Sequence, residues 1–234
     1  MSGRDAILSK IRASLGAGGD EAARKTAVAE RLAGHPRGVI PERGHLPAAE
    51  RLALFRDMAI KANASVATLA GYDALPDAVL TYLRERNLPA SVRMGTDPRL
   101  AEAPWHEAAT LEVKSGASDG EDVTGVSHAL GAVAETGTLA LTSGTDNPTT
   151  VNFLPEHHLV VVDAKDVTGD LESLWSALRT SRGDGSMPRT VNLVTGPSRS
   201  GDIEQVLLMG AHGPRSVHIL VIDPEGTMPA ERTP

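Results

Sequence analysis

The chain has 234 residues and a formal net charge of −7 at neutral pH, from 23 basic and 30 acidic residues. This acidic balance disfavours a nucleic-acid backbone as a general partner. No stretch approaches the roughly 20 apolar residues that a membrane span requires. Asp5 and Lys10 interrupt the N-terminus before a signal-peptide core could form. The sequence therefore predicts a cytoplasmic protein with no nucleic-acid partner and no membrane span.

The sequence contains no cysteine. This excludes disulfides, a thiol nucleophile and thiolate ligands for an iron–sulfur cluster in this chain. Aromatic residues make up only 3% of the chain, so a stacking platform for a base or a flavin is hard to build. We expect no cofactor in this chain, and any electrons that it helps to move must sit on another molecule.

The first predicted element is an N-terminal arm, residues 1–46. Ile7, Leu8 and Ile11 recur at helical spacing, which predicts an amphipathic helix over residues 4–15. The rest of the arm is polar and rich in glycine and proline. We interpret the arm as mobile, with one or two helices, and a disordered tail is the alternative.

From residue 47 onward, helical and strand patterns alternate. Helices are expected over residues 47–62, 76–86, 171–179 and 203–209, and strands over 65–69, 90–94, 111–114, 123–134, 137–142, 158–162, 191–194 and 217–222. This order predicts one α/β domain, residues 47–234, with a mixed, largely parallel sheet and helices on both faces. Ligands bind such sheets beyond the carboxyl ends of the strands. The loops after Leu130, Val133 and Val194 are therefore expected to carry the site.

The segment AETGTLALTS, residues 134–143, combines an acid, a glycine and two hydroxyls. Gly137 allows close approach of a ligand to the backbone, and Thr136 and Thr138 offer hydroxyl and amide donors. Glu135, partly removed from water at such a turn, suits a base or nucleophile. The equal alternative is a capping glutamate that accepts hydrogen bonds from neighbouring amides.

The segment GPSRSGDIE, residues 196–204, follows a strand and is predicted to open the helix over 203–209. Ser200 or Gly201 is the expected N-cap, with Glu204 completing a capping pattern. Arg199 and the hydroxyls of Ser198 and Ser200 are predicted to hold a small carboxylate or phosphate, and Asp202 is counted among these ligand-binding residues. A capped helix with an internal Arg–Asp pair is the alternative.

Histidines near these segments are candidates for proton transfer. His212, beside the ligand-binding candidate Gly213 in the turn GAHGP, is the strongest, although it can also serve only to tie the turn to a backbone carbonyl. His128 is expected to face the same mouth or to be a satisfied core residue. His157 and His158 are adjacent strand residues and point to opposite faces, so no metal site is predicted.

The two segments AETGTL and GPSRSGDIE together resemble the paired signature of the LUD domain, the lactate-utilisation family, and the chain resembles its stand-alone, cysteine-free branch, the C component. The resemblance implies a NagB/RpiA/CoA-transferase-like fold. It also implies iron–sulfur partner subunits that oxidise lactate to pyruvate, with this chain supplying a small-carboxylate-binding, assembly or regulatory role. The iron–sulfur clusters are then expected in the partners.

Two other functions stay open at this point. Glu135 is similar in placement to the nucleophilic glutamate of CoA transferases with this fold, which would make the chain an autonomous acyl- or CoA-transferring enzyme. A non-catalytic small-ligand sensor would use the same site.

The stretch GTDNPTTVNFLPEHH, residues 144–158, lacks the arginine that related chains commonly carry, so no carboxylate-binding role transfers there.

Overall fold

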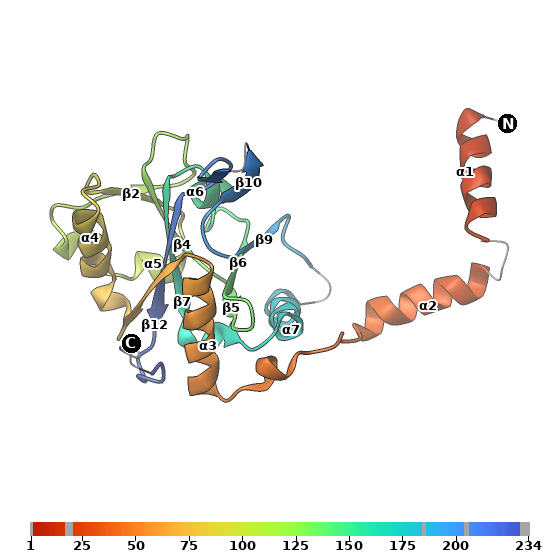
Figure 1. The fold of residues 1–234 in the computed structure, drawn as a ribbon, viewed down its shortest axis with the longest axis horizontal. Helices are drawn as coiled ribbons and strands as arrows, with labels where there is room; N and C mark the ends of the chain where they lie inside the picture. The colour runs from red at the N-terminus through yellow and green to blue at the C-terminus, as the bar shows by residue number, and fades with distance from the viewer. Residues whose placement is uncertain (1, 17–20, 184–185, 204–205, 230–234) are drawn as a thin grey trace. The chain divides into compact units, whose positions relative to one another are not determined.

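The computed structural model describes residues 2–16, 21–183, 186–203 and 206–229 (Figure 1). The chain divides into two compact units, one up to Val39 and the other from Ile40 onward. The first unit contains α1 (Gly3–Ser14) and α2 (Glu21–Gly34), whose residues are all exposed to solvent. Ser2 caps α1 in a capping box with Asp5, which satisfies two backbone amides at its start.

The second unit is built on a six-stranded parallel sheet. Its spatial order is β1 (Ser65–Leu69), β12 (Ser216–Ile222), β7 (His157–Asp163), β4 (Thr124–His128), β2 (Ser91–Met94) and β3 (Glu112–Ser115). The helices of this unit are α3 (Ala48–Lys61), α4 (Leu75–Glu85), α5 (Pro98–Ala101), α6 (Thr149–Phe153) and α7 (Leu171–Arg182). These observations confirm the predicted α/β class.

A second, four-stranded sheet contains two antiparallel pairs. Its order is β8 (Val167–Thr168), β5 (Gly131–Val133), β6 (Thr138–Thr142) and β9 (Val191–Val194), with β6 antiparallel to both neighbours. The single strand expected over 123–134 is therefore wrong, because the chain leaves the main sheet after His128 and joins the second sheet at Gly131. The amide of Leu130 already donates to the carbonyl of Ala140 on β6.

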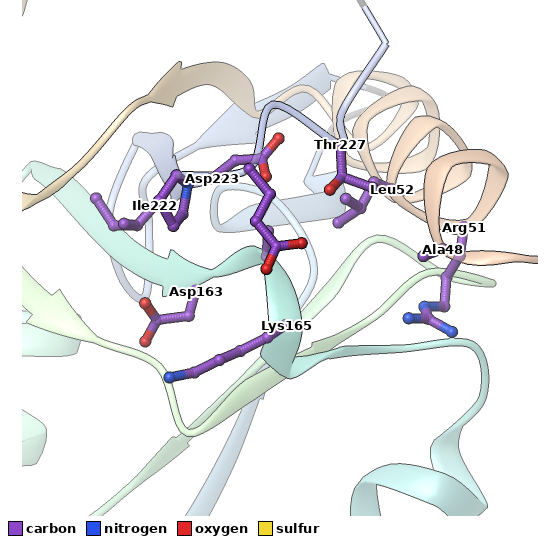
Figure 2. Close-up of a pocket in the computed structure, with 11 residues that line it drawn as sticks. Ala48, Arg51, Leu52, Asp163, Lys165, Ile222, Asp223 and Thr227 are labelled. Atoms are coloured by element: carbon purple, nitrogen blue, oxygen red, sulfur yellow. The ribbon is translucent and has the colours of Figure 1, made fainter.

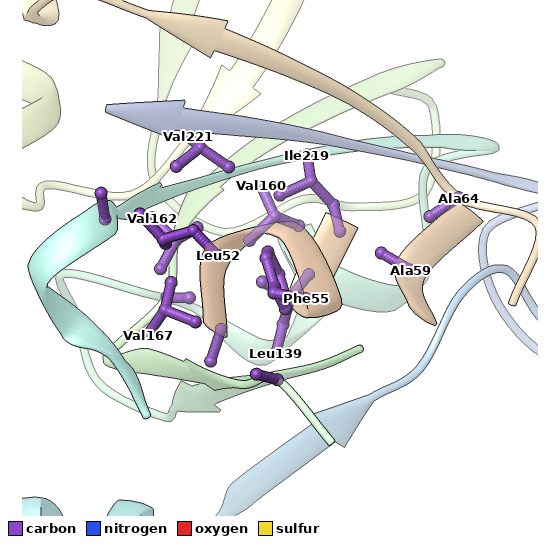
Figure 3. Packing of buried hydrophobic residues seen from close by; sticks show 14 of the residues in the cluster. Leu52, Phe55, Ala59, Ala64, Leu139, Val160, Val162, Val167, Ile219 and Val221 are labelled. Atoms are coloured by element: carbon purple, nitrogen blue, oxygen red, sulfur yellow. The ribbon is translucent and has the colours of Figure 1, made fainter. Parts of the chain in front are cut away.

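The main sheet is covered on both faces. On one face, Leu52, Phe55 and Ala59 of α3 pack with Val160 and other buried residues against the second sheet, as Figure 3 shows. On the other face, α4 and α5 bury residues such as Val79, Leu83 and Leu100 against the sheet. Strands buried on both faces account for the near-continuous apolar runs of the sequence.

The helix expected over residues 203–209 is wrong. β10 (Arg199–Ile203) and β11 (Val206–Met209) form an antiparallel pair instead, called the hairpin below, in which Arg199 pairs with Met209 and Ser200 with Leu208. The expected N-cap at Ser200 or Gly201 therefore does not exist, and Glu204 lies outside the described residues. A segment this short gains little from helix formation, since the first turn is costly, whereas the hairpin satisfies its backbone groups locally.

Gly137 is predicted to be irreplaceable for a packing reason. Its φ is +68°, and a Cβ at this position would lie 2.4 Å from the backbone nitrogen of Ala59 in α3. Gly183 has a similar φ of +64° but nothing within 4 Å. We expect Gly183→Ala to lower the free energy of unfolding by about 1 kcal/mol and Gly137→Ala by about 3 kcal/mol or more, because α3 must also shift. Urea denaturation of both variants measures this, and equal losses would contradict the close-packing argument.

Candidate functional site

The AETGTL turn is held tightly by the second sheet and α7. The amide of Glu135 donates to the carbonyl of Gly169, and its carboxylate accepts a hydrogen bond from the amide of Leu171 at 3.2 Å, at the start of α7. Glu135 is only 7% exposed. This geometry is that of a helix-capping carboxylate. A catalytic role for Glu135 stays a prediction.

The two signature segments meet through a chain of threonine hydroxyls. The Oγ1 atoms of Thr136 and Thr138 lie 2.7 Å apart, and Thr138 Oγ1 lies 2.7 Å from that of Thr195, just before the GPSRSGDIE segment. The structure thus brings the predicted Thr136, Gly137 and Thr138 next to the entrance of the second segment, although 57 residues separate Thr138 from Thr195.

The hairpin carries the predicted ligand-binding residues at the amino edge of the main sheet. The amide of Ser198 donates to the carbonyl of Pro214, just before β12, and the amide of Gly210 donates to Ser198. Arg199 and Gly201 are exposed, Ser200 is half-buried, and Asp202 lies on β10. Among the residues whose side chains the structure describes, Arg199 makes no ion pair.

His212 and His128 lie at opposite edges of the main sheet, so they do not face the same ligand-binding opening. His212 is exposed in the turn before β12, and its amide donates to Ser198 Oγ at 3.3 Å. Gly213 lies beside it, close to Ser198 and Phe153. His128 ends β4 and is 2% exposed. His212 is therefore placed with the predicted hairpin site, and His128 with a different group of residues.

A cluster of polar residues that the sequence analysis did not single out surrounds His128 at the carboxyl edge. After β2 the chain passes to α5 on one face of the sheet, whereas after β4 it passes to the second sheet on the other face. Neighbouring strands that send the chain to opposite faces form a topological switch point, which is where open α/β sheets bind ligands. The cluster consists of Tyr72, Asp97, Arg99, His128, Asp163, Lys165 and Asp166.

Tyr72, His128 and Asp163 form the centre of this cluster. Tyr72 Oη lies 2.7 Å from His128 Nε2 and 3.0 Å from Asp163 Oδ2, and the imidazole and the carboxylate are 3.5 Å apart. Burial and the adjacent Asp163 raise the pKa of Tyr72, so its hydroxyl stays protonated. Burial alone would raise the pKa of Asp163, but the interaction with His128 and the hydrogen bond from Tyr72 outweigh it and lower that pKa.

The three groups can be bonded in two ways that differ by one proton. His128 Nδ1 lies 2.7 Å from the carbonyl oxygen of Ala129, which can only accept, so Nδ1 carries a hydrogen. With a neutral imidazole, Nε2 accepts from the Tyr72 hydroxyl. With a protonated imidazole, Nε2 donates to Tyr72 Oη and the hydroxyl donates to Asp163. Both arrangements leave every donor of the three groups paired.

Charged pairs flank this centre. Arg99 donates from Nε and Nη2 to the two carboxylate oxygens of Asp97, at 3.0 and 2.7 Å. Burial favours a higher pKa for Asp97, but this bidentate pair lowers it. Asp166 is different: burial and the neighbouring Asp163 both raise its pKa. The edge thus combines carboxylates that stay ionised with one that holds its proton more strongly.

A simple signal in the sequence marks these residues. Tyr72, Asp97, Asp163 and Asp223 each come within three residues of the end of a predicted strand. These positions lie outside the loops after Leu130, Val133 and Val194, where the sequence predicts the site.

The described residues were compared with the requirements of a metal site and of a membrane-spanning helix. In residues 2–16, 21–183, 186–203 and 206–229, no three His, Asp or Glu side chains gather in a group that could hold a metal ion. His157 and His158 point apart, toward Tyr82 and Ser127 respectively. Within the same ranges, no helix has the length and apolar character needed to cross a membrane.

The fold and the polar edge define an α/β protein whose parallel sheet gathers ionisable residues at its switch point. The chain belongs to the LUD domain family, whose match extends over residues 52–222 and includes both signature segments.

Relatives in this family match part of the chain. An uncharacterized protein from Neisseria meningitidis is 35% identical over 107 residues, which are 46% of this chain and 45% of that protein. Lactate utilization protein C from Shouchella clausii is 31% identical over 91 residues, 39% of this chain and 40% of the relative. That from Bacillus subtilis is 34% identical over 93 residues, 39% of each chain. The chain therefore matches less than half the length of these relatives.

One solved structure shows the same fold. The crystal structure of a DUF162 family protein from Deinococcus radiodurans aligns with a TM-score of 0.57 and 21% sequence identity, covering 76% of this chain and 99% of that chain. At this identity, the likeness concerns the fold alone.

The depressed pKa of Asp163 predicts a pH-dependent contribution to stability. A carboxylate with a lowered folded-state pKa stabilises the fold above its ordinary value of 3.8, and this contribution is lost as the pH falls below it. We expect Asp163→Asn to lower the free energy of unfolding by about 2 kcal/mol at pH 7, and the difference from the unmodified chain to shrink between pH 4 and pH 2.5. Urea denaturation across this range measures it, with exposed Asp73→Asn as the control. A difference that is constant with pH would contradict the assignment.

Proposed function

We propose that this chain is a cytoplasmic, non-redox subunit of an L-lactate utilisation system, in which iron–sulfur partner proteins oxidise lactate to pyruvate. The observation that carries the proposal is the similarity to proteins named lactate utilization protein C, within a family match that spans residues 52–222. The absence of cysteine supports the division of labour, because the two electrons removed from lactate need carriers that this sequence cannot ligate through thiolates.

Within that system, we assign the chain a small-carboxylate-binding role at the hairpin. Arg199 is exposed and makes no ion pair with the described residues, and its fork matches a carboxylate. Ser198, just before β10, and Ser200, on β10, are the neighbours of Arg199 in the chain and offer their hydroxyls. The hydroxyls of Thr136, Thr138 and Thr195 join the two signature segments nearby. Assembly with the iron–sulfur partners and regulation of them are the other uses that such a subunit would have.

The test is lactate-dependent reduction of an acceptor by the native complex, which is first purified through the tagged chain to identify its partners and then rebuilt from those partners with and without this chain. We expect activity to fall at least tenfold when this chain is omitted and to return when it is added back. When the Arg199→Ala chain is added back, we expect the complex to assemble but to recover only a fraction of its lactate-dependent activity. The Arg84→Ala chain, changed at another exposed arginine, is the matched control. Full activity without the chain, or purification without any iron–sulfur partner, would refute the proposal.

Glu135→Gln separates a capping role from a catalytic one. Glutamine keeps an oxygen that can accept from the amide of Leu171 but loses the charge that favours the start of α7. We expect a loss of about 0.5–1 kcal/mol in the free energy of unfolding and no loss of lactate oxidation by the complex. Abolished turnover in a variant of unchanged stability would instead make Glu135 a catalytic residue.

A further inference from the structure

A cavity of about 190 Å³ lies at the carboxyl ends of β7 and β12, beside the first turns of α3 (Figure 2). It is on the opposite edge of the main sheet from the hairpin that carries Arg199. Leu52, Ile222 and Pro224 contribute apolar wall, while Arg51 and Lys165 bring positive charge. The volume suits a molecule of a few non-hydrogen atoms rather than a nucleotide or a coenzyme.

Arg51 is the residue that points to an anion. Its Nε is buried and has no hydrogen-bond partner, and the side chain forms no ion pair with the described part of the chain. The guanidinium of Arg51 lines the cavity, so a ligand carboxylate there can pair with it. Arg51 also lies in the N-terminal part of α3, where the helix dipole already places positive charge and no side chain caps the helix. Two sources of positive potential thus meet at this wall.

Acidic side chains on the other walls restrict which anion fits. Asp163, Asp223 and Glu225 also line the cavity, so the lining has three carboxylates against two cations. Figure 2 shows Lys165 extending toward Asp163, with Arg51 on the other side of the pocket. A dianion such as phosphate would be repelled by the carboxylates. A monocarboxylate that also presents a hydrogen-bond donor would satisfy Arg51 at one end and an acid at the other.

We propose that this cavity binds a short carboxylate carrying a hydrogen-bond donor on the adjacent carbon, a hydroxyl or an ammonium. The ligand carboxylate pairs with Arg51, and its donor faces the carboxylates at the ends of β7 and β12. Asp163 connects the cavity to Tyr72 and His128, so a bound donor joins the same hydrogen-bonded group. The site is separate from the hairpin and does not depend on the function proposed above.

Calorimetric titration of the full chain tests this proposal. The titrations use the Arg199→Ala chain, in which the hairpin site proposed above is removed, so that the cavity is measured alone. The probes are L-lactate, L-alanine, propionate and inorganic phosphate. We expect L-lactate or L-alanine to bind with one molecule per chain and at least tenfold more tightly than propionate or phosphate. Which of the two binds more tightly identifies the donor as a hydroxyl or an ammonium.

Adding Arg51→Gln is expected to weaken that binding at least tenfold, and exposed Arg84→Gln to leave it unchanged. Arg51→Lys, which keeps the charge without the planar fork, serves if the glutamine variant does not fold and should weaken binding several-fold. The proposal is overturned if none of the probes binds, if propionate binds as tightly as both of the others, or if the Arg51 variants bind normally. Each of these outcomes leaves the omission assay on the complex unaffected, so the two proposals fail separately.

Discussion

The structure depends most on the burial of β7 on both faces and along both edges. Val160 and Val162 face α3 and the second sheet, Leu159 and Val161 face the opposite core, and all four are fully buried. The strand pairs with β12 on one side and β4 on the other. A register slip of one residue would exchange the two sets of side chains and place His158 in the wrong core. The register of the whole sheet is therefore fixed here.

This register decides what lies at each edge of the sheet. Because β7 and β12 are parallel and in step, Asp163 is level with Ile222 and adjacent to Asp223, and His128, paired with Val161, ends β4 two residues short of that level. The ionisable groups of three strands then gather at the carboxyl edge without any sequence motif to announce them. The amino ends of the same strands receive the hairpin, through the bond from Ser198 to Pro214.

The sequence predicted most of the regular elements because their patterns are local. The strands over 65–69 and 191–194 match β1 and β9 to the residue, and the helices α3, α4 and α7 begin and end close to their expected bounds. The pattern predicts a helix where β10 and β11 lie, since a short apolar run carries no period that separates a helix from a strand. Position near a strand end marks Tyr72, His128 and Asp163 one by one in the sequence, but only the sheet order shows that the three strand ends come together.

The two signature segments are explained in large part by packing against the end of α3. Gly137, at φ +68°, approaches the backbone of Met58 and Ala59, and Gly196, at φ +71°, would place a Cβ 2.0 Å from the carbonyl oxygen of Ala62. Both positions demand glycine for conformation and for space. The Thr138–Thr195 bond then ties the segments to each other. A shared signature of this kind marks a structural junction, so ligand chemistry must be sought in the side chains that the junction leaves unpaired. At the hairpin, the side chain without an ion pair in the described part of the chain is that of Arg199. At the opposite edge of the main sheet, away from this junction, it is that of Arg51.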